Sequence, residues 1–191
     1  TLAAARGLCD MGGIAKKAKR GDPAKYQNLA TKIQKAFLAS FVDPQGALAG
    51  SIEGLSPGGH YIDGAVAEAF TWNILQDWTG NTAKATLDLL GKLKVDSGGY
   101  KRNDDGLSSY DNNEWILVDL RIANALRRAG RGREADAIVA HVVRKAAANF
   151  YLVPELYNDT AGAGATGDYT GSIPMVGYGA AFALRTPDFT H

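Results

Sequence analysis

Two kinds of helical pattern alternate along the chain, and this alternation limits the fold more than any other feature. The first kind is apolar on nearly all sides and predicts helices buried from most directions. The second kind has one apolar stripe, with steps of three or four residues, and predicts helices that cover the outside. The first kind occupies residues 2–14, 62–75, 115–126 and 173–184. The second has its stripe at Tyr26, Leu29, Ile33, Phe37 and Phe41, then Leu87, Leu90 and Leu93, then Ile138, Val139, Val142 and Val143.

Long connectors follow the predicted outer helices at intervals of roughly fifty to sixty residues. They read FVDPQGALAGS from Phe41, VDSGGYKRNDDG from Val95 and FYLVPELYND from Phe150. A repeating helix pair with one connector is typical of an α/α toroid or a helical solenoid. The fold class that we predict is therefore all-α, with almost no strand.

The predicted helices are too few to close a toroid. We expect residues 1–191 to form one unit, the C-terminal half of an (α/α)6 barrel, and its N-terminal half is not in this chain. The chain also begins at Thr1 inside an apolar helical pattern, which is typical of a cut segment. Left alone, such a half-ring would expose a larger apolar edge than soluble monomers usually show.

Charge and cysteine content narrow the classes of partner. Lys and Arg together number 21 against 20 for Asp and Glu, so we expect no nucleic acid or membrane partner. The chain has no apolar run approaching the roughly 18 residues that span a bilayer, and we expect a soluble protein. The single cysteine, Cys9, cannot form an internal disulfide and favours a reducing, cytoplasmic location.

Cofactor and metal patterns are weak. The segment GAGATG at residues 162–167 matches G-x-G-x-x-G, but that fingerprint needs a strand directly before it and a helix directly after it. Here polar residues precede it and DYTGSIP follows it, so we interpret it as a flexible connector. The acidic residues beside it, Asp159 and Asp168, do not form a calcium loop. The three histidines, His60, His141 and His191, do not have the spacing of zinc ligands. We therefore predict neither a cofactor nor a metal ion.

The middle connector carries side chains that suit a sugar. It reads YKRNDDGLSSYDNNEW over residues 100–115 and contains Arg102, Asp104, Asp105, Tyr110, Glu114 and Trp115. Arginine donates from a planar fork, carboxylates accept hydrogen bonds from hydroxyls, and aromatic rings provide apolar stacking faces. The alternative is an ordinary polar loop that leads into a helix.

The third connector places a carboxylate in an apolar run. Phe150 to Val153 suit an extended, partly buried strand, and Pro154 biases Val153 toward the β or polyproline region. Glu155 follows and precedes apolar Leu156. Its carboxylate is therefore either a surface group or one that points into a pocket.

The order of four segments resembles the second half of the catalytic domain of glucoamylase-type glycoside hydrolases, family 15. These segments are GGYKRNDDG with NNEW, then ALRRAGRGREADAIV, then FYLVPELYND, then GSIPMVGYGAAFAL. The opening TLAAARGLCDMGGIA also resembles the family helix that follows its general-acid glutamate. The resemblance runs through most of the chain.

The resemblance implies an inverting exo-acting enzyme that releases glucose from the non-reducing end of α-glucosides of the maltose, isomaltose or trehalose type. Glu155 would be the general base, and Arg102 would bind sugar hydroxyls in the first glucose subsite. Tyr110, Glu114 and Trp115 would line the adjoining pocket. The general acid would lie on the missing N-terminal half. The predicted partners are therefore that half and the α-glucoside substrate.

One departure leaves the substrate open. Fungal members of the family have an aromatic-rich connector where this sequence has NDDGLSS, so the linkage is not predicted. If the chain acted alone, the acid would have to be Asp104, Asp105, Glu114 or Asp159, which we do not expect. The main alternative is a non-catalytic helical repeat protein that binds a sugar or a protein through its connectors. A third is an unrelated toroid enzyme.

Overall fold

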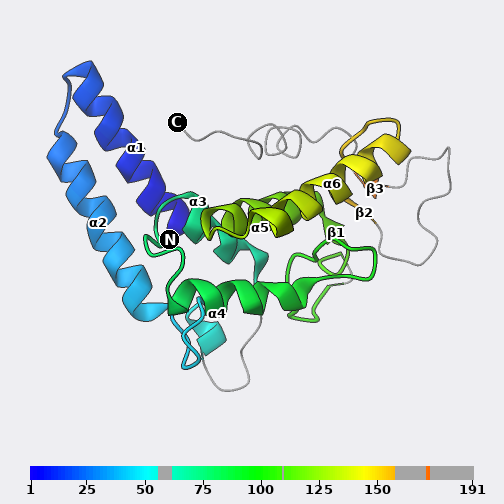
Figure 1. Ribbon diagram of the computed structural model, residues 1–191. Helices are drawn as coiled ribbons and strands as arrows, with labels where there is room; N and C mark the ends of the chain where they lie inside the picture. Colours follow the sequence, from blue (N-terminus) through cyan, green and yellow to red (C-terminus); the bar gives the residue numbers. More distant parts are fainter. Residues whose placement is uncertain (56–61, 109, 158–170, 173–191) are drawn as a thin grey trace.

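The protein is mostly helical, as the sequence predicts (Figure 1). The computed structural model describes residues 1–55, 62–108, 110–157 and 171–172. The predicted helix 173–184, the segment 162–167, and His60, His191, Asp159 and Asp168 lie outside these residues. Among the described helices, none combines the length and the apolar character that crossing a membrane requires.

The elements fall into long helices, short helical turns and one small sheet. The α-helices are α1 (Leu2–Ala18), α2 (Pro23–Ser40), α3 (Glu68–Thr71), α4 (Asn81–Leu90), α5 (Ile116–Arg128) and α6 (Gly132–Ala148). The 3-10 turns are η1 (Glu53–Leu55), η2 (Gly64–Ala67) and η3 (Gly91–Leu93). The strands are β1 (Glu114–Trp115), β2 (Leu156–Tyr157) and β3 (Gly171–Ser172).

Helices α1 and α2 form a hairpin that projects from the rest of the molecule (Figure 1). The Asp22 carboxylate accepts a hydrogen bond from Lys25 N at 3.0 Å and starts α2, with Pro23 at its first position. The prediction that the first helix is buried on most sides is wrong within the described chain. Met11 is 45% exposed and Ile14 58%, because α1 packs mainly against α2.

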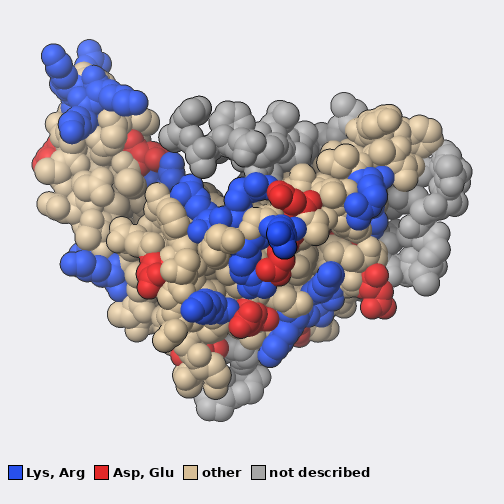
Figure 2. Space-filling view, viewed as in Figure 1, with Lys and Arg blue, Asp and Glu red and all other residues tan. Residues whose placement is uncertain are grey.

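Basic side chains gather over the free tip of this hairpin (Figure 2). Lys16 and Lys17 lie in the last turn of α1, and Lys19 follows in the left-handed region at φ 51°. Cations stabilise the C-terminal end of a helix because they complement its dipole. The cluster therefore has a local structural role.

The predicted helix 62–75 is divided into η2 and α3. The Asp63 carboxylate accepts from Ala65 N at 2.8 Å and starts a 3-10 turn, and Asn73 ends the helical run at φ 57°. The segment is nevertheless buried as predicted, with Phe70 fully inaccessible and Val66 4% exposed. The apolar pattern therefore predicted the burial of this segment correctly, but not the length of its helix.

Helix α5 is the centre of the core, and α6 packs against it (Figure 1). The apolar pattern over 115–126 predicted this helix and its burial, and both are confirmed. The predicted stripes of α4 and α6 also face inward in part, since Leu90 is fully buried and Val142 is 3% exposed. Val143 is 57% exposed and does not belong to the buried stripe.

The sheet joins the middle and third connectors. Strand β1 pairs antiparallel with β2, with Glu114 opposite Tyr157 and Trp115 opposite Leu156, and β2 pairs with β3. The prediction of an extended run from Phe150 is wrong at its start. Phe150 and Tyr151 have φ of 56° and 58°, because Tyr151 N bonds to a carbonyl of the last turn of α6.

Candidate functional site

Backbone hydrogen bonds hold the middle connector in place from both sides. Gly64 N donates to the Arg102 carbonyl at 2.8 Å, and Arg102 N donates to the Asp111 carbonyl at 3.0 Å. A β-bridge also pairs Lys101 with Glu114. Arg102 is therefore fixed between the start of η2 and the entry to β1.

Asp104 and Asp105 of this connector accept hydrogen bonds that stabilise the conformation of the loop. The Asp104 carboxylate accepts a hydrogen bond from Ile62 N, and the Asp105 carboxylate accepts one from Leu107 N at 2.9 Å. Between Asp105 and Leu107 the chain turns at Gly106, whose φ of 72° suits glycine. These contacts shape the loop that presents Arg102.

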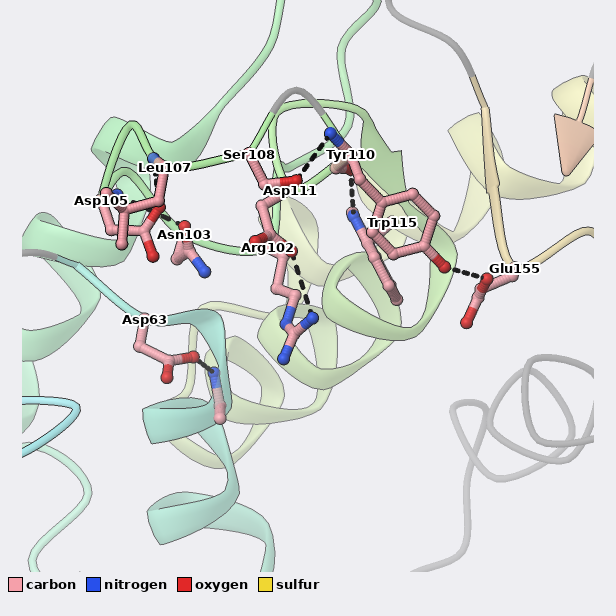
Figure 3. A network of polar contacts seen from close by, with 11 residues as sticks. Asp63, Arg102, Asn103, Asp105, Leu107, Ser108, Tyr110, Asp111, Trp115 and Glu155 are labelled. Atoms are coloured by element: carbon pink, nitrogen blue, oxygen red, sulfur yellow. Dashed lines mark hydrogen bonds and ion pairs between the residues drawn. The ribbon is translucent and has the colours of Figure 1, made fainter.

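Arg102, Tyr110 and Trp115 form one cluster (Figure 3). The Arg102 guanidinium lies 5.4 Å from the centroid of the Trp115 ring and bonds to Asp111 Oδ1 at 3.1 Å. The Tyr110 and Trp115 ring centroids are 4.9 Å apart in an edge-to-face arrangement, and Trp115 Nε1 donates to the Tyr110 carbonyl at 3.2 Å. The Arg102 side chain is 52% exposed, so its remaining donors can reach a ligand.

Glu155 joins this cluster from the third connector (Figure 3). The Tyr110 hydroxyl donates to Glu155 Oε2. Pro154 and Leu156 are buried on either side, and Ile116 N donates to the Glu155 carbonyl at 3.3 Å. The apolar neighbours thus anchor the backbone, which leaves the half-buried carboxylate to point at Tyr110.

The structure brings together four of the five predicted site residues: Arg102, Tyr110, Trp115 and Glu155. It does not bring Glu114 to them. The Glu114 side chain has no exposed surface, and it bonds to His141 Nε2 at 3.0 Å and to Lys145 Nζ at 2.5 Å. Both partners lie on α6.

Burial and hydrogen bonding shift the pKa of Glu114 in opposite directions. Burial favours its neutral form, but hydrogen bonds from His141, Lys145 and Ser97 outweigh burial and lower its pKa from 4.5 to about 2. Asp119 lies nearby and is fully inaccessible. Its burial and the charge of Glu114 raise the pKa of Asp119 well above 3.8.

Sequence reasoning missed the partners of Glu114. His141 was predicted only not to bind a metal, yet His141 and Lys145 are four apart on α6 and so share one face. That spacing was the available signal. Glu114, Asp119 and His141 offer potential metal-ligand atoms within 4.8 Å of one another, but the Lys145 ammonium already neutralises Glu114 and would repel a cation.

Replacing Asp119 with asparagine is expected to stabilise the protein increasingly as pH rises. In the wild type, the unfolded state releases the Asp119 proton above about pH 3.8 while the folded state retains it, so stability falls as pH rises toward the folded pKa. An asparagine side chain at this position cannot titrate and can still accept from Tyr100 N, which lies 2.7 Å from Asp119 Oδ1. Urea unfolding between about pH 4 and pH 7 measures the difference.

The matched control is Asp119→Leu, which removes the acceptor for Tyr100 N and is expected to destabilise the protein at every pH. If Asp119→Asn and the wild type had the same dependence on pH, then Asp119 would not retain its proton in the folded state.

No known family pattern matches this chain, and no curated protein matches it. Three solved glycosidase structures do match. A variant in complex with glucose is 20% identical with a TM-score of 0.65, over 81% of this chain and 40% of that one. A wild-type glycosidase is 20% identical with a TM-score of 0.62, over 78% and 38%. A second variant is 19% identical with a TM-score of 0.62, over 94% and 43%.

These likenesses concern the fold. The chain has the fold of part of these glycosidases and spans about two fifths of their length.

Proposed function

We propose that this chain is the C-terminal half of the catalytic (α/α)6 barrel of an inverting, exo-acting glycoside hydrolase of the glucoamylase type. It would release glucose from the non-reducing end of α-glucosides. The observation that carries the proposal is the meeting of Glu155 with Arg102, Tyr110 and Trp115, which come from two separate connectors. The glycosidase fold and the binding of glucose by one structural neighbour support it.

Glu155 has the general-base role in this proposal. Its carboxylate takes a proton from a water molecule as the water oxygen bonds to the anomeric carbon. The glycosidic bond breaks on the opposite face, and the leaving oxygen takes a proton from the acid on the N-terminal half. The Tyr110 hydroxyl orients the Glu155 carboxylate, because it donates to Oε2.

Arg102 and Trp115 have binding roles. The Arg102 guanidinium provides charged donors for sugar hydroxyls, and its stacking near Trp115 limits the directions in which these donors point. Trp115 is 7% exposed, so its ring would act on the sugar mainly through the Arg102 guanidinium that lies over it. Together they would hold the first glucose unit beside Glu155.

An apolar groove at the start of α1 supports the need for an N-terminal half. Its volume is about 260 Å³, and its apolar lining includes Leu2, Phe37, Phe41 and Trp72. A further helix layer packed on this groove would bury its apolar side chains and complete the ring.

The test is hydrolysis by the complete protein that contains this chain, with maltose, isomaltose and trehalose as substrates. Proton NMR of the first product should show β-glucose, because inversion at an α-linkage yields that anomer. The 191-residue chain alone should show no turnover. Initial release of α-glucose would contradict inversion, and binding of these sugars without hydrolysis would favour a non-catalytic sugar-binding protein.

A further inference from the structure

The two residues of β1 face opposite sides of the sheet. Trp115 lies with Arg102 and Tyr110 in the candidate site. Glu114 lies behind it, fully buried, and bonds to His141 and Lys145 of α6. The backbone that carries Trp115 is therefore held from behind by two bonds to a helix.

The same contacts reach the strand that follows Glu155. Lys145 Nζ lies 4.5 Å from the centroid of the Tyr157 ring, and Tyr157 is opposite Glu114 in the β1–β2 pair. Strand β2 begins directly after Glu155, whose carbonyl accepts from Ile116 N. One ammonium group thus contacts both strands that carry the candidate site.

Two glycines allow the backbone to pack closely against Glu114 and His141. A Cβ at Gly99 would lie 2.4 Å from the Glu114 side chain, and a Cβ at Gly98 would lie 3.3 Å from the His141 ring. Gly98 also has a φ of 108°, which few other residues adopt. This stretch continues directly to Arg102, so the fit around Glu114 also constrains the connector that presents the site.

Stability alone does not account for this arrangement. A carboxylate and an ammonium lose hydration when buried, and apolar residues of similar size are often equally stable in their place. The bonds from His141 and Lys145 to Glu114 do impose defined distances and directions, which apolar contacts do not. These contacts therefore fix the positions of β1 and β2.

We propose that Glu114, His141 and Lys145 form a positioning clamp that fixes β1 and β2, so that Trp115 and the Glu155 carboxylate keep their places in the site. This inference rests on the proposed function. The three residues act through the strands and do not contact the substrate.

The test uses Lys145→Met and Glu114→Gln in the complete protein. Lys145→Met keeps an apolar stem beside Tyr157 and removes the ammonium group. We expect each variant to lower kcat on the α-glucoside about 10- to 100-fold, because a small displacement of a reacting group is sufficient for such a loss. The KM should change less than kcat, since binding by Arg102 and Trp115 tolerates a small displacement that the chemical step does not. Arg144→Met is the control, because Arg144 is the exposed neighbour on the same helix.

A second measurement does not depend on activity. Hydrogen exchange of the amides of residues 114–116 and 155–157 should be faster in both variants and unchanged in Arg144→Met. Lys145→Arg should restore slow exchange and part of kcat, because it keeps the positive charge.

The double variant Glu114→Gln/Lys145→Met separates positioning from stability. It leaves no unpaired charge, so its unfolding midpoint should recover while kcat remains low. Full recovery of kcat, or unchanged exchange in the single variants, would overturn the clamp. A wild type without hydrolytic activity whose variants still exchange faster would reject the proposed function and retain the clamp.

Discussion

Replacing Glu155 with glutamine in the complete protein is expected to lower kcat on an α-linked disaccharide by about a hundredfold to ten thousandfold. Glutamine has the size of glutamate and can still accept from the Tyr110 hydroxyl. It cannot take a proton from the attacking water. Initial rates of glucose release at saturating substrate measure this loss.

Glucose binding should survive the same substitution, because Arg102 and Trp115 remain in place. Isothermal titration with glucose tests this directly. Glu53→Gln provides the control, since Glu53 is an exposed residue of η1. Wild-type kcat in Glu155→Gln would remove Glu155 from the mechanism, while loss of glucose binding would show that Glu155 acts mainly as a sugar ligand.

Replacing Arg121 with methionine is expected to lower the free energy of unfolding by about 3 kcal/mol. Arg121 Nε lies 2.6 Å from Glu68 Oε1, and Glu68 is 2% exposed. The substitution leaves the Glu68 carboxylate buried without its cation. Both residues line the groove near α1 and the Arg121 side chain is 23% exposed, so the lower end of the usual range of about 3–5 kcal/mol applies. Urea unfolding at neutral pH gives the value.

The double variant Glu68→Leu/Arg121→Met removes both charges and should recover most of this loss. The double-variant comparison therefore assigns the loss to the uncompensated carboxylate rather than to lost packing of the arginine stem. A single variant as stable as the wild type would mean that water solvates Glu68 well in the groove.

Local sequence signals were sufficient to predict the long helices. The apolar stripe from Tyr26 to Phe41 predicted α2, and a continuous apolar pattern predicted α5. The grouping of Arg102 with Trp115 was also predictable, because both lie in one connector. These features depend on residues that are close together in the sequence.

The remaining features depend on contacts between distant segments. The side of β1 on which Glu114 lies is set by pairing with β2 and by the position of α6, and neither can be derived from NNEW. The short α3 ends at Thr71, and Asn73 just after it has a left-handed conformation that the apolar pattern did not indicate. The exposure of Ile14 depends on which helices pack against α1, and that information is tertiary.

The hydrogen bond between Tyr110 and Glu155 has a consequence for engineering. It joins two loops that are far apart in the sequence, so neither loop is an independent module. Grafting a foreign segment over residues 100–115 to change the specificity of the proposed site would remove the Tyr110 hydroxyl that bonds to the carboxylate. A transplanted loop should therefore retain a tyrosine at position 110, or bring its own 150–157 segment with it.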